Sequence, residues 1–124
     1  MKLGESLEDY LEALLLLENN GSIKSIEVAK MLEVSRPSVN KAMSVLKEYG
    51  FITQETYGDI YLTKQGRSKA ESVLNRHLKI RNFLIDVLEV NEIVAEIDAC
   101  KIEHIISDET FNKLTSFTIN YKKR

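Results

Sequence analysis

Several residue types that mark other classes of protein are scarce in this sequence. It has one cysteine, one proline, five glycines and no tryptophan in 124 residues. A single cysteine cannot form an internal disulfide, which favours a reducing, cytoplasmic location. The low glycine and proline content argues against a disordered or collagen-like chain. No apolar run of about 18 residues is present, so we expect no membrane-spanning helix. Residues 1–10 lack the basic and apolar regions of a secretory signal.

What is present is the composition of a soluble globular protein, with 44% hydrophobic and 29% charged residues. The length accommodates one domain, or one small domain with a helical extension. The net charge of −2 is unevenly distributed. Residues 22–69 hold eight Lys or Arg and five acidic residues, a net charge of +3, whereas residues 70–110 hold four and nine, a net charge of −5. This asymmetry predicts one surface that binds an anion and another that binds a cation.

Hydrophobic residues recur at helical spacing over most of the chain. The predicted helices cover residues 6–18, 25–33, 35–49, 67–88, 92–106 and 110–120. Serines are placed to cap four of them, namely Ser6, Ser25, Ser35 and Ser107. In the fifth helix the residues predicted to face inward are Ile93, Ile97 and Ile105. Two short extended runs, 51–55 and 60–63, predict a β-hairpin. The predicted fold is therefore mainly α with a small β-hairpin.

The order helix, short turn, helix and hairpin across residues 23–63 is that of a winged helix-turn-helix. In this motif the second helix lies in the DNA major groove, with its N-terminal side chains toward the base edges. The residues that suit that position are Arg36, Ser38, Asn40 and Lys41. Pro37, also counted with the DNA-binding residues, fits the first turn of this helix. Residues that suit phosphates or the DNA backbone are Ser25, Ser35, Lys47 and Tyr57. Double-stranded DNA is the predicted partner. The alternative is a helix pair that serves protein contacts, with its charges simply solvated.

A second group of residues has the chemistry of metal ligands. They lie on three predicted helices: Asp9 and Glu12 on the first, His77 on the fourth, and Cys100, Glu103 and His104 on one face of the fifth. A thiolate, carboxylates and imidazoles from three helices suit a divalent transition ion. Each residue also has an ordinary structural role open to it. A lone cysteine is often a small buried hydrophobe, and an acid in a first turn often pairs with the helix dipole.

Five stretches together resemble the family of metal-dependent transcriptional repressors that includes the diphtheria toxin repressor, the iron-dependent regulators and the manganese transport regulator. The stretches are residues 7–17 (LEDYLEALLLL), 34–52, 61–66, 75–88 and 100–109 (CKIEHIISDE). The resemblance covers about residues 6–115. It implies a winged-helix DNA-binding domain over residues 1–66 and a helical metal-binding and dimerisation domain over residues 67–124, the short two-domain form.

The family resemblance also implies ligands and partners. By position, the main metal site would consist of Asp9, Cys100, Glu103 and His104, and a second site would use Glu12 and His77. The implied ion is Fe(II) or Mn(II). The implied function is a homodimeric repressor, not an enzyme, that binds palindromic operator DNA and controls metal-homeostasis genes. No membrane and no small-molecule substrate are implied.

The sequence departs from the family pattern at four positions. Iron-type members usually have methionine at Asp9, and manganese-type members usually have glutamate at Cys100, so this chain mixes the two patterns. Arg81 stands where a carboxylate often serves the second site, and Glu96 where some iron-type members have histidine. A cation at Arg81 would repel a second metal ion.

Two other functions stay open from the residues. A thiol sensor would use Cys100 as a redox switch without metal, lose DNA binding on mild oxidation and be indifferent to chelators. A metal-dependent hydrolase using Cys100 and His104 is a remote alternative. It lacks support because the sequence has no glycine-rich phosphate loop, no HExxH pattern and no serine nucleophile elbow.

Overall fold

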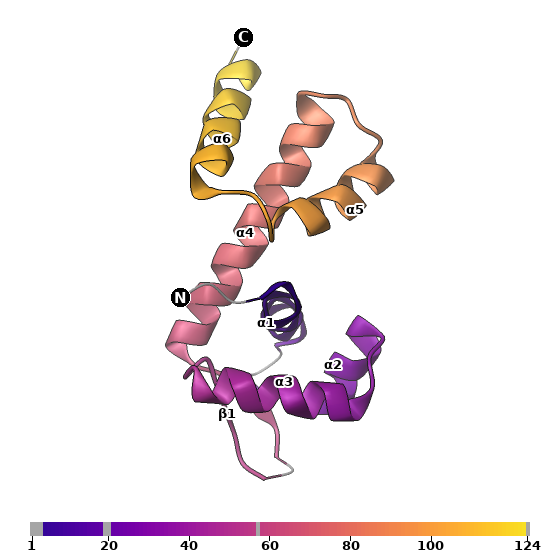
Figure 1. Cartoon of the computed structure of the whole chain (residues 1–124), viewed down its shortest axis with the longest axis vertical. Helices are drawn as coiled ribbons and strands as arrows, with labels where there is room; N and C mark the ends of the chain where they lie inside the picture. The colour runs from indigo at the N-terminus through magenta and orange to yellow at the C-terminus, as the bar shows by residue number, and fades with distance from the viewer. Residues whose placement is uncertain (1–3, 19–20, 57, 124) are drawn as a thin grey trace. The chain divides into compact units, whose positions relative to one another are not determined.

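The computed structural model describes residues 4–18, 21–56 and 58–123. These residues form six helices and a two-stranded antiparallel hairpin: α1 (Glu5–Leu17), α2 (Ser25–Leu32), α3 (Arg36–Glu48), β1 (Ile52–Gln54), β2 (Ile60–Leu62), α4 (Lys64–Asp86), α5 (Glu92–Ile102) and α6 (Asp108–Lys122) (Figure 1). The mainly helical fold with one small hairpin is as predicted. None of the helices in the described parts of the chain is long and apolar enough to cross a lipid bilayer.

The chain divides into two compact units, Met1–Ser72 (unit 1) and Val73–Arg124 (unit 2), and α4 contributes to both. In unit 1, α1, α2, α3 and the hairpin share one apolar core. Its largest fully buried side chains are Leu11, Leu14, Ile23, Val28, Val39, Met43, Leu46, Ile52 and Ile60. These residues come from every element up to β2, so burial of apolar surface holds unit 1 together.

The helix pair α2–α3 and the hairpin have the connections expected of a winged helix. Glu33 ends α2 in the left-handed conformation, with φ 54°. Ser35 caps α3, as predicted, because its Oγ accepts a hydrogen bond from the Ser38 amide at 3.2 Å. Strand β1 pairs with β2 in the register Ile52↔Leu62, and Ile60 also exchanges two backbone hydrogen bonds with Ile23. The hairpin is thereby tied to the segment that precedes α2.

Gly66 lies in the first turn of α4, where the helix starts against the backbone of Phe51. A Cβ atom at this position would overlap the Phe51 carbonyl oxygen. The Gly66 amide donates a hydrogen bond to Thr63 Oγ1 at 3.0 Å. The position therefore requires the absence of a side chain, which only glycine provides.

Two of the predicted caps are wrong. Helix α1 begins at Glu5 with Gly4 as its N-cap, and α2 begins at Ser25 itself with Lys24 as its N-cap. At α2 the Glu27 carboxylate accepts a hydrogen bond from the Lys24 amide at 3.2 Å. An acid three residues into the helix thus performs part of the capping that the serine was expected to perform.

In unit 2, charged side chains join the helices. Arg76 on α4 bonds to Asp108 Oδ1 at 2.9 Å and to the Ile106 carbonyl, and its guanidinium lies 5.0 Å from the centre of the Phe111 ring. Lys122 near the end of α6 pairs with Asp86 at the end of α4 at 2.6 Å. These contacts connect α4 to α6 at both ends of α6.

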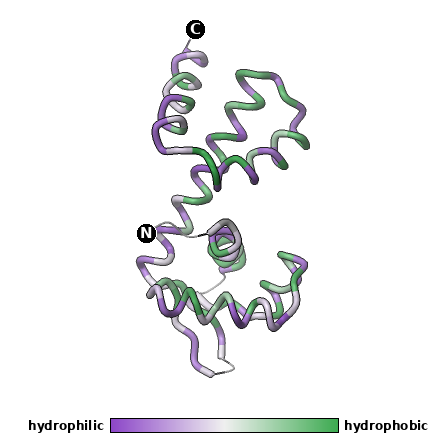
Figure 2. The backbone as a smooth tube through the Cα atoms, viewed as in Figure 1, coloured by the Kyte–Doolittle hydropathy of each residue, from purple (hydrophilic) through white to green (hydrophobic). Residues whose placement is uncertain are grey.

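The predicted inward face of α5 is wrong. Ala95 and Ala99 are its buried residues, whereas Ile93, Ile97 and Ile105 are 73%, 52% and 75% exposed. Figure 2 shows hydrophobic stretches through the end of α4 and along α5. The small alanines occupy the covered face, and the larger isoleucines form an uncovered apolar one.

Candidate metal centre and nucleic-acid interface

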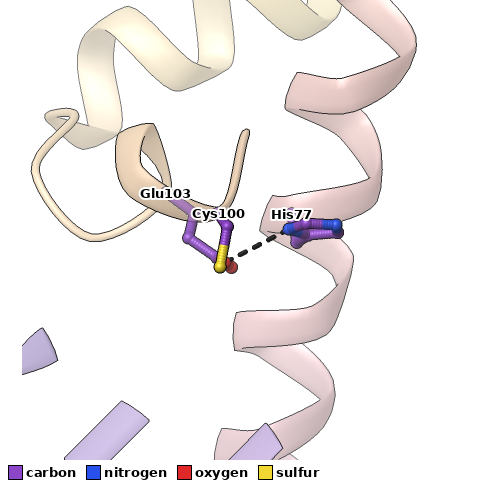
Figure 3. Close-up of side chains that lie close together, drawn as sticks. All are labelled: His77, Cys100 and Glu103. Atoms are coloured by element: carbon purple, nitrogen blue, oxygen red, sulfur yellow. Dashed lines mark hydrogen bonds and ion pairs between the residues drawn. The ribbon is translucent and has the colours of Figure 1, made fainter. Parts of the chain in front are cut away.

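Three donor side chains converge in unit 2, one from α4, one from α5 and one from the turn that follows α5. His77, Cys100 and Glu103 each offer a ligand atom, and these atoms lie within 4.8 Å of one another (Figure 3). His77 Nδ1 lies 3.2 Å from Glu103 Oε1. The His77 and Glu103 side chains are buried, whereas Cys100 is exposed. The cluster therefore has a buried side and a side open to solvent.

The residues of this cluster fit a divalent transition ion. Ligand–metal distances of about 2.0–2.3 Å place any two ligands of one ion within about 4.6 Å of each other, close to the observed spread. An imidazole nitrogen, a thiolate sulfur and a carboxylate oxygen together suit iron or zinc, and the nitrogen and oxygen donors also suit manganese. No rearrangement of the helices is needed to bring the three donors around one ion.

Glu103 and His104 follow α5 and are not part of it. The helix ends at Ile102, and both residues lie in the next turn, which corrects the prediction that they share a face of a continuous helix. Glu103 keeps helical angles (φ −56°, ψ −27°), and its amide still bonds to the Ala99 carbonyl at 3.0 Å. Its carboxylate therefore keeps nearly the direction that a helical residue would have. His104 is buried, with Nε2 3.8 Å from Glu103 Oε1.

The structure brings together predicted ligands of both sites. The family resemblance assigns His77 to a second, neighbouring ion and Cys100 and Glu103 to the main site, and these three residues lie side by side in unit 2. Asp9 and Glu12 lie on α1 of unit 1, where both are half-buried. These two residues remain predicted ligands.

Arg81 and Glu96, two residues at which the chain departs from the family pattern, lie beside His77. The second ring nitrogen of His77, Nε2, lies 2.8 Å from Glu96 Oε1, and the other Glu96 oxygen accepts from Arg81 Nε at 2.8 Å. A signal for both exists in the sequence. Arg81 follows His77 by four residues on α4, and Glu96 precedes Cys100 by four on α5, so each shares a helix face with a ligand.

The nucleic-acid interface predicted for unit 1 coincides with a groove between α3, the start of α2 and the hairpin. The groove has a volume of about 650 Å³. Four of the predicted DNA-binding residues line it: Ser25, Arg36, Asn40 and Lys47. The three on α3, Arg36, Asn40 and Lys47, are exposed. The residues between them on the other face, Val39, Ala42, Met43 and Leu46, are buried. Helix α3 thus has an exposed polar face and a buried apolar face that packs in the core of unit 1.

Several predicted DNA-binding residues also hold the motif together. Ser35 and Ser38 share a hydrogen bond between their hydroxyl groups at 2.8 Å, and Lys47 Nζ donates to the Gln54 carbonyl at 2.8 Å. Lys47 therefore connects α3 to β1. Pro37 and Lys41 are exposed on α3 but do not line the groove. Tyr57 lies outside the described residues.

Lys24 and Gln54 line the groove and were not singled out from the sequence. Lys24 Nζ pairs with Asp59 Oδ1 at 3.1 Å, and Gln54 Nε2 donates to the Gly58 carbonyl at 3.0 Å. Both contacts stabilise the turn of the hairpin. The Lys24 contact joins residues 35 positions apart, so local sequence does not predict it, whereas the Gln54 contact spans only four positions.

Comparison with known proteins matches both halves of the chain to one family. Residues 2–60 match the family described as "Iron dependent repressor, N-terminal DNA binding domain". Residues 63–123 match the family described as "Iron dependent repressor, metal binding and dimerisation domain".

Individual relatives agree with this assignment. An uncharacterized HTH-type transcriptional regulator of Methanocaldococcus jannaschii is 36% identical over 98% of this chain and 99% of its own length. The transcriptional regulator MntR of Salmonella typhimurium is 34% identical over 92% of this chain and 73% of its own length. The solved structure of the manganese regulator SloR superposes with a TM-score of 0.78 at 28% identity, over 98% of this chain and 55% of that chain. The protein therefore belongs to the iron dependent repressor family, in which a DNA-binding domain is followed by a metal-binding and dimerisation domain.

Proposed function

We propose that this protein is a homodimeric transcriptional repressor of metal-homeostasis genes that binds operator DNA when it holds Fe(II) or Mn(II). The observation that carries the proposal is the convergence of His77, Cys100 and Glu103 in unit 2, within the region matched to a metal-binding domain. The ion assignment is supported by the donor chemistry, by the family description and by the manganese regulator among the similar structures. Cysteine favours iron, and the carboxylates accept either ion.

The proposal assigns the site residues as follows. His77, Cys100, Glu103 and His104 bind the ion from unit 2, and Asp9, with Glu12 near it on α1, supplies carboxylate from unit 1. We place the domain boundary between residues 66 and 67, in the first turn of α4, near where the two family matches meet. We assign a DNA-binding rather than enzymatic role, in the cytoplasm, where the chain meets DNA.

On the DNA side, Arg36, Ser38, Asn40 and Lys41 are the proposed base-contacting residues. Arginine pairs with guanine edges and asparagine with adenine edges in the major groove. Phosphate contacts are assigned to Ser25, Ser35, Lys47 and Tyr57, with Pro37 shaping the first turn of α3. The support is the exposed polar face of α3 beside the groove.

Metal binding and DNA binding are coupled in this proposal through the ligands of both units. A bound divalent ion supplies positive charge that offsets the repulsion among the carboxylates and favours the Cys100 thiolate. Asp9 and Glu12 belong to unit 1 and the other proposed ligands to unit 2, so an ion that uses both sets would make DNA binding by unit 1 depend on metal. Coupling of this kind is typically about 1–3 kcal/mol, or roughly 5–150-fold in DNA affinity.

The test is DNA binding with and without metal. Duplexes selected from a random pool in the presence of Mn(II), or of Fe(II) without oxygen, supply the operator, and fluorescence anisotropy then measures the affinity. We expect at least about fivefold tighter binding with metal than with chelator, and loss of that difference in His104→Ala and Asp9→Ala. Lys113→Ala, an exposed change on α6, is the matched control. Equal affinity with metal and with chelator would contradict the proposal.

The same assay separates the thiol-sensor alternative, which is favoured by one observation, the exposure of Cys100. A sensor of this type would lose DNA binding on mild oxidation whether or not metal is removed. A metal-dependent repressor responds to chelator while fully reduced. Cys100→Ser, assayed under reducing conditions with Mn(II), completes the comparison.

A further inference from the structure

We infer that Arg81 and Glu96 form a positioning pair for the metal site: the pair orients His77 toward Cys100 and Glu103, and its guanidinium limits unit 2 to one bound ion. This inference rests on the proposed function, because it concerns how the same ligands hold the metal. It assigns a role to two residues at which the chain departs from the family pattern.

The geometry places His77 between two carboxylates on opposite ring nitrogens. Nδ1 faces Glu103 at 3.2 Å, on the side of the three-residue cluster, and Nε2 faces Glu96 at 2.8 Å. The His77 side chain is buried, whereas that of Glu96 is 55% exposed. The shorter contact is therefore on the outer side of the ring, away from Cys100 and Glu103.

A carboxylate oxygen can only accept a hydrogen bond, so the 2.8 Å contact with Glu96 requires a proton on Nε2 of His77. Nδ1 is then the ring nitrogen available to an ion held between His77 and Glu103, and the ion would replace the present contact of Nδ1 with the Glu103 carboxylate. Histidine ligands generally donate their other N–H to a carboxylate, a carbonyl or water, which holds the ring orientation and makes the ligand nitrogen more basic. Glu96 is in the right place for this role.

Arg81 engages the oxygen of Glu96 that His77 does not use. Its Nε donates to Glu96 Oε2 at 2.8 Å, so both carboxylate oxygens have a fixed partner. The side chains of Arg81 and Glu96 are 31% and 55% exposed, so the space outside His77 is open to solvent. An ion could reach this space from solvent, so the charges of the side chains around it decide whether a second cation binds there. The guanidinium keeps a positive charge at all ordinary pH values and would repel one.

The first experiment counts ions by titration of the reduced protein with Co(II), monitored by the thiolate-to-cobalt and d–d absorption bands, and with Mn(II) by equilibrium dialysis. We expect one ion per chain in the wild type and in Arg81→Lys, which keeps the charge. We expect two in Arg81→Glu, where the new carboxylate joins that of Glu96 as a ligand and no guanidinium repels the second ion. Lys113→Glu makes the same change of charge on α6 and should leave the count at one.

The second experiment measures orientation. In the zinc-loaded protein labelled with ¹⁵N-histidine, we expect the wild-type His77 signal to show a protonated Nε2 and a metal-bound Nδ1. Glu96→Ala should mix the two nitrogen environments and weaken the first ion roughly 10–100-fold, as loss of such supporting carboxylates does elsewhere. Glu96→Gln keeps an acceptor oxygen and should restore most of the affinity and a single His77 signal.

The outcomes separate this inference from the proposed function. Absence of the thiolate-to-cobalt band in the wild type would overturn the metal site itself. A wild type that binds one ion, with Arg81→Glu also binding one and Glu96→Ala unchanged in affinity and spectrum, would show the pair to be a surface ion pair only. Two ions in the wild type would overturn the limit set by Arg81.

Discussion

The two units of this chain differ in what they bury. Unit 1 buries apolar side chains from all its elements and exposes the polar face of α3. Unit 2 buries His77, Glu103 and His104, and exposes large apolar side chains on α5 and α6, including Ile93, Ile97 and Phe117. Buried ionisable groups require partners, and exposed apolar groups in number usually mark an interface.

Unit 1 also exposes some large apolar side chains, such as Leu16 and Ile26, but unit 2 exposes more of them and buries more ionisable side chains. The features that unit 2 leaves open are the two that its family description names, metal binding and dimerisation. Stability in unit 1 comes from its own core, whereas unit 2 is expected to gain stability from an ion and from a second copy by mass action. The four predictions below test this contrast.

The largest effect is expected at Gly66, where α4 begins against the backbone of Phe51. Gly66→Ala would force the start of α4 away from Phe51, because the added methyl group overlaps the Phe51 carbonyl. We expect a loss of about 3 kcal/mol in the free energy of unfolding, measured by urea denaturation. Ser68→Ala, at an exposed position two residues further along α4, is the control and should change stability by less than about 0.5 kcal/mol. Equal effects of the two substitutions would contradict the close packing.

The uncovered apolar face of α5 should be needed for dimerisation. Ile97→Asp replaces a side chain that is 52% exposed in the single chain. Losing the burial of one isoleucine costs about 1.5–3 kcal/mol per copy, so the dimer should dissociate at least tenfold more readily in sedimentation equilibrium. Met31→Asp alters an exposed apolar residue of unit 1 and should leave the dimer intact. An unchanged dimer in Ile97→Asp would place the interface elsewhere.

Substitutions in the groove of unit 1 should weaken DNA binding and leave the metal affinity of the DNA-free protein unchanged. Arg36→Ala is expected to weaken operator binding by about 1–3 kcal/mol, the range for a base-contacting arginine. Lys30→Ala removes a charge from the exposed last turn of α2, outside the groove, and should have a smaller effect. If both variants lose affinity equally, the groove contributes general charge and not specific contacts.

The smallest effect concerns the ion pair between Glu18 and Arg67, both in unit 1. The hydrogen bonds from Arg67 hold the pKa of Glu18 below its ordinary value of 4.5, although partial burial opposes the shift. The pair therefore stabilises the folded state above pH 4.5, and this contribution is lost as the pH falls through the lowered pKa. Glu18→Gln should be less stable than the wild type at pH 7, with the gap closing toward pH 3. A gap that is constant with pH would contradict this assignment.

Much of the fold could be predicted from local sequence. Ser35 and Pro37 mark the start of α3, and the Gly58-Asp59 turn marks the hairpin. The face of α5 could not be predicted in this way, because a stripe of isoleucines looks the same whether its own chain or a partner covers it. The end of α5 was also misplaced. Glu103 keeps helical angles, and no glycine or proline marks the stop.

The candidate site was predictable by residue type but not by grouping. The residues Cys100, Glu103 and His104 stand out by spacing alone. Which imidazole meets which carboxylate depends on how α4 packs against α5, so the placement of His77 between Glu96 and Glu103 could not be derived from spacing. Arg81 illustrates the same point, since its charge suggested repulsion of an ion but not its pairing with Glu96.

The most direct test of metal-controlled DNA binding is reciprocity. The affinity for Mn(II) should be measured by dialysis with and without saturating operator DNA, beside the DNA affinity with and without Mn(II). We predict that DNA tightens Mn(II) binding by the same factor by which Mn(II) tightens DNA binding, roughly 5–150-fold. A metal affinity that DNA leaves unchanged would show that the ion held by unit 2 does not control unit 1.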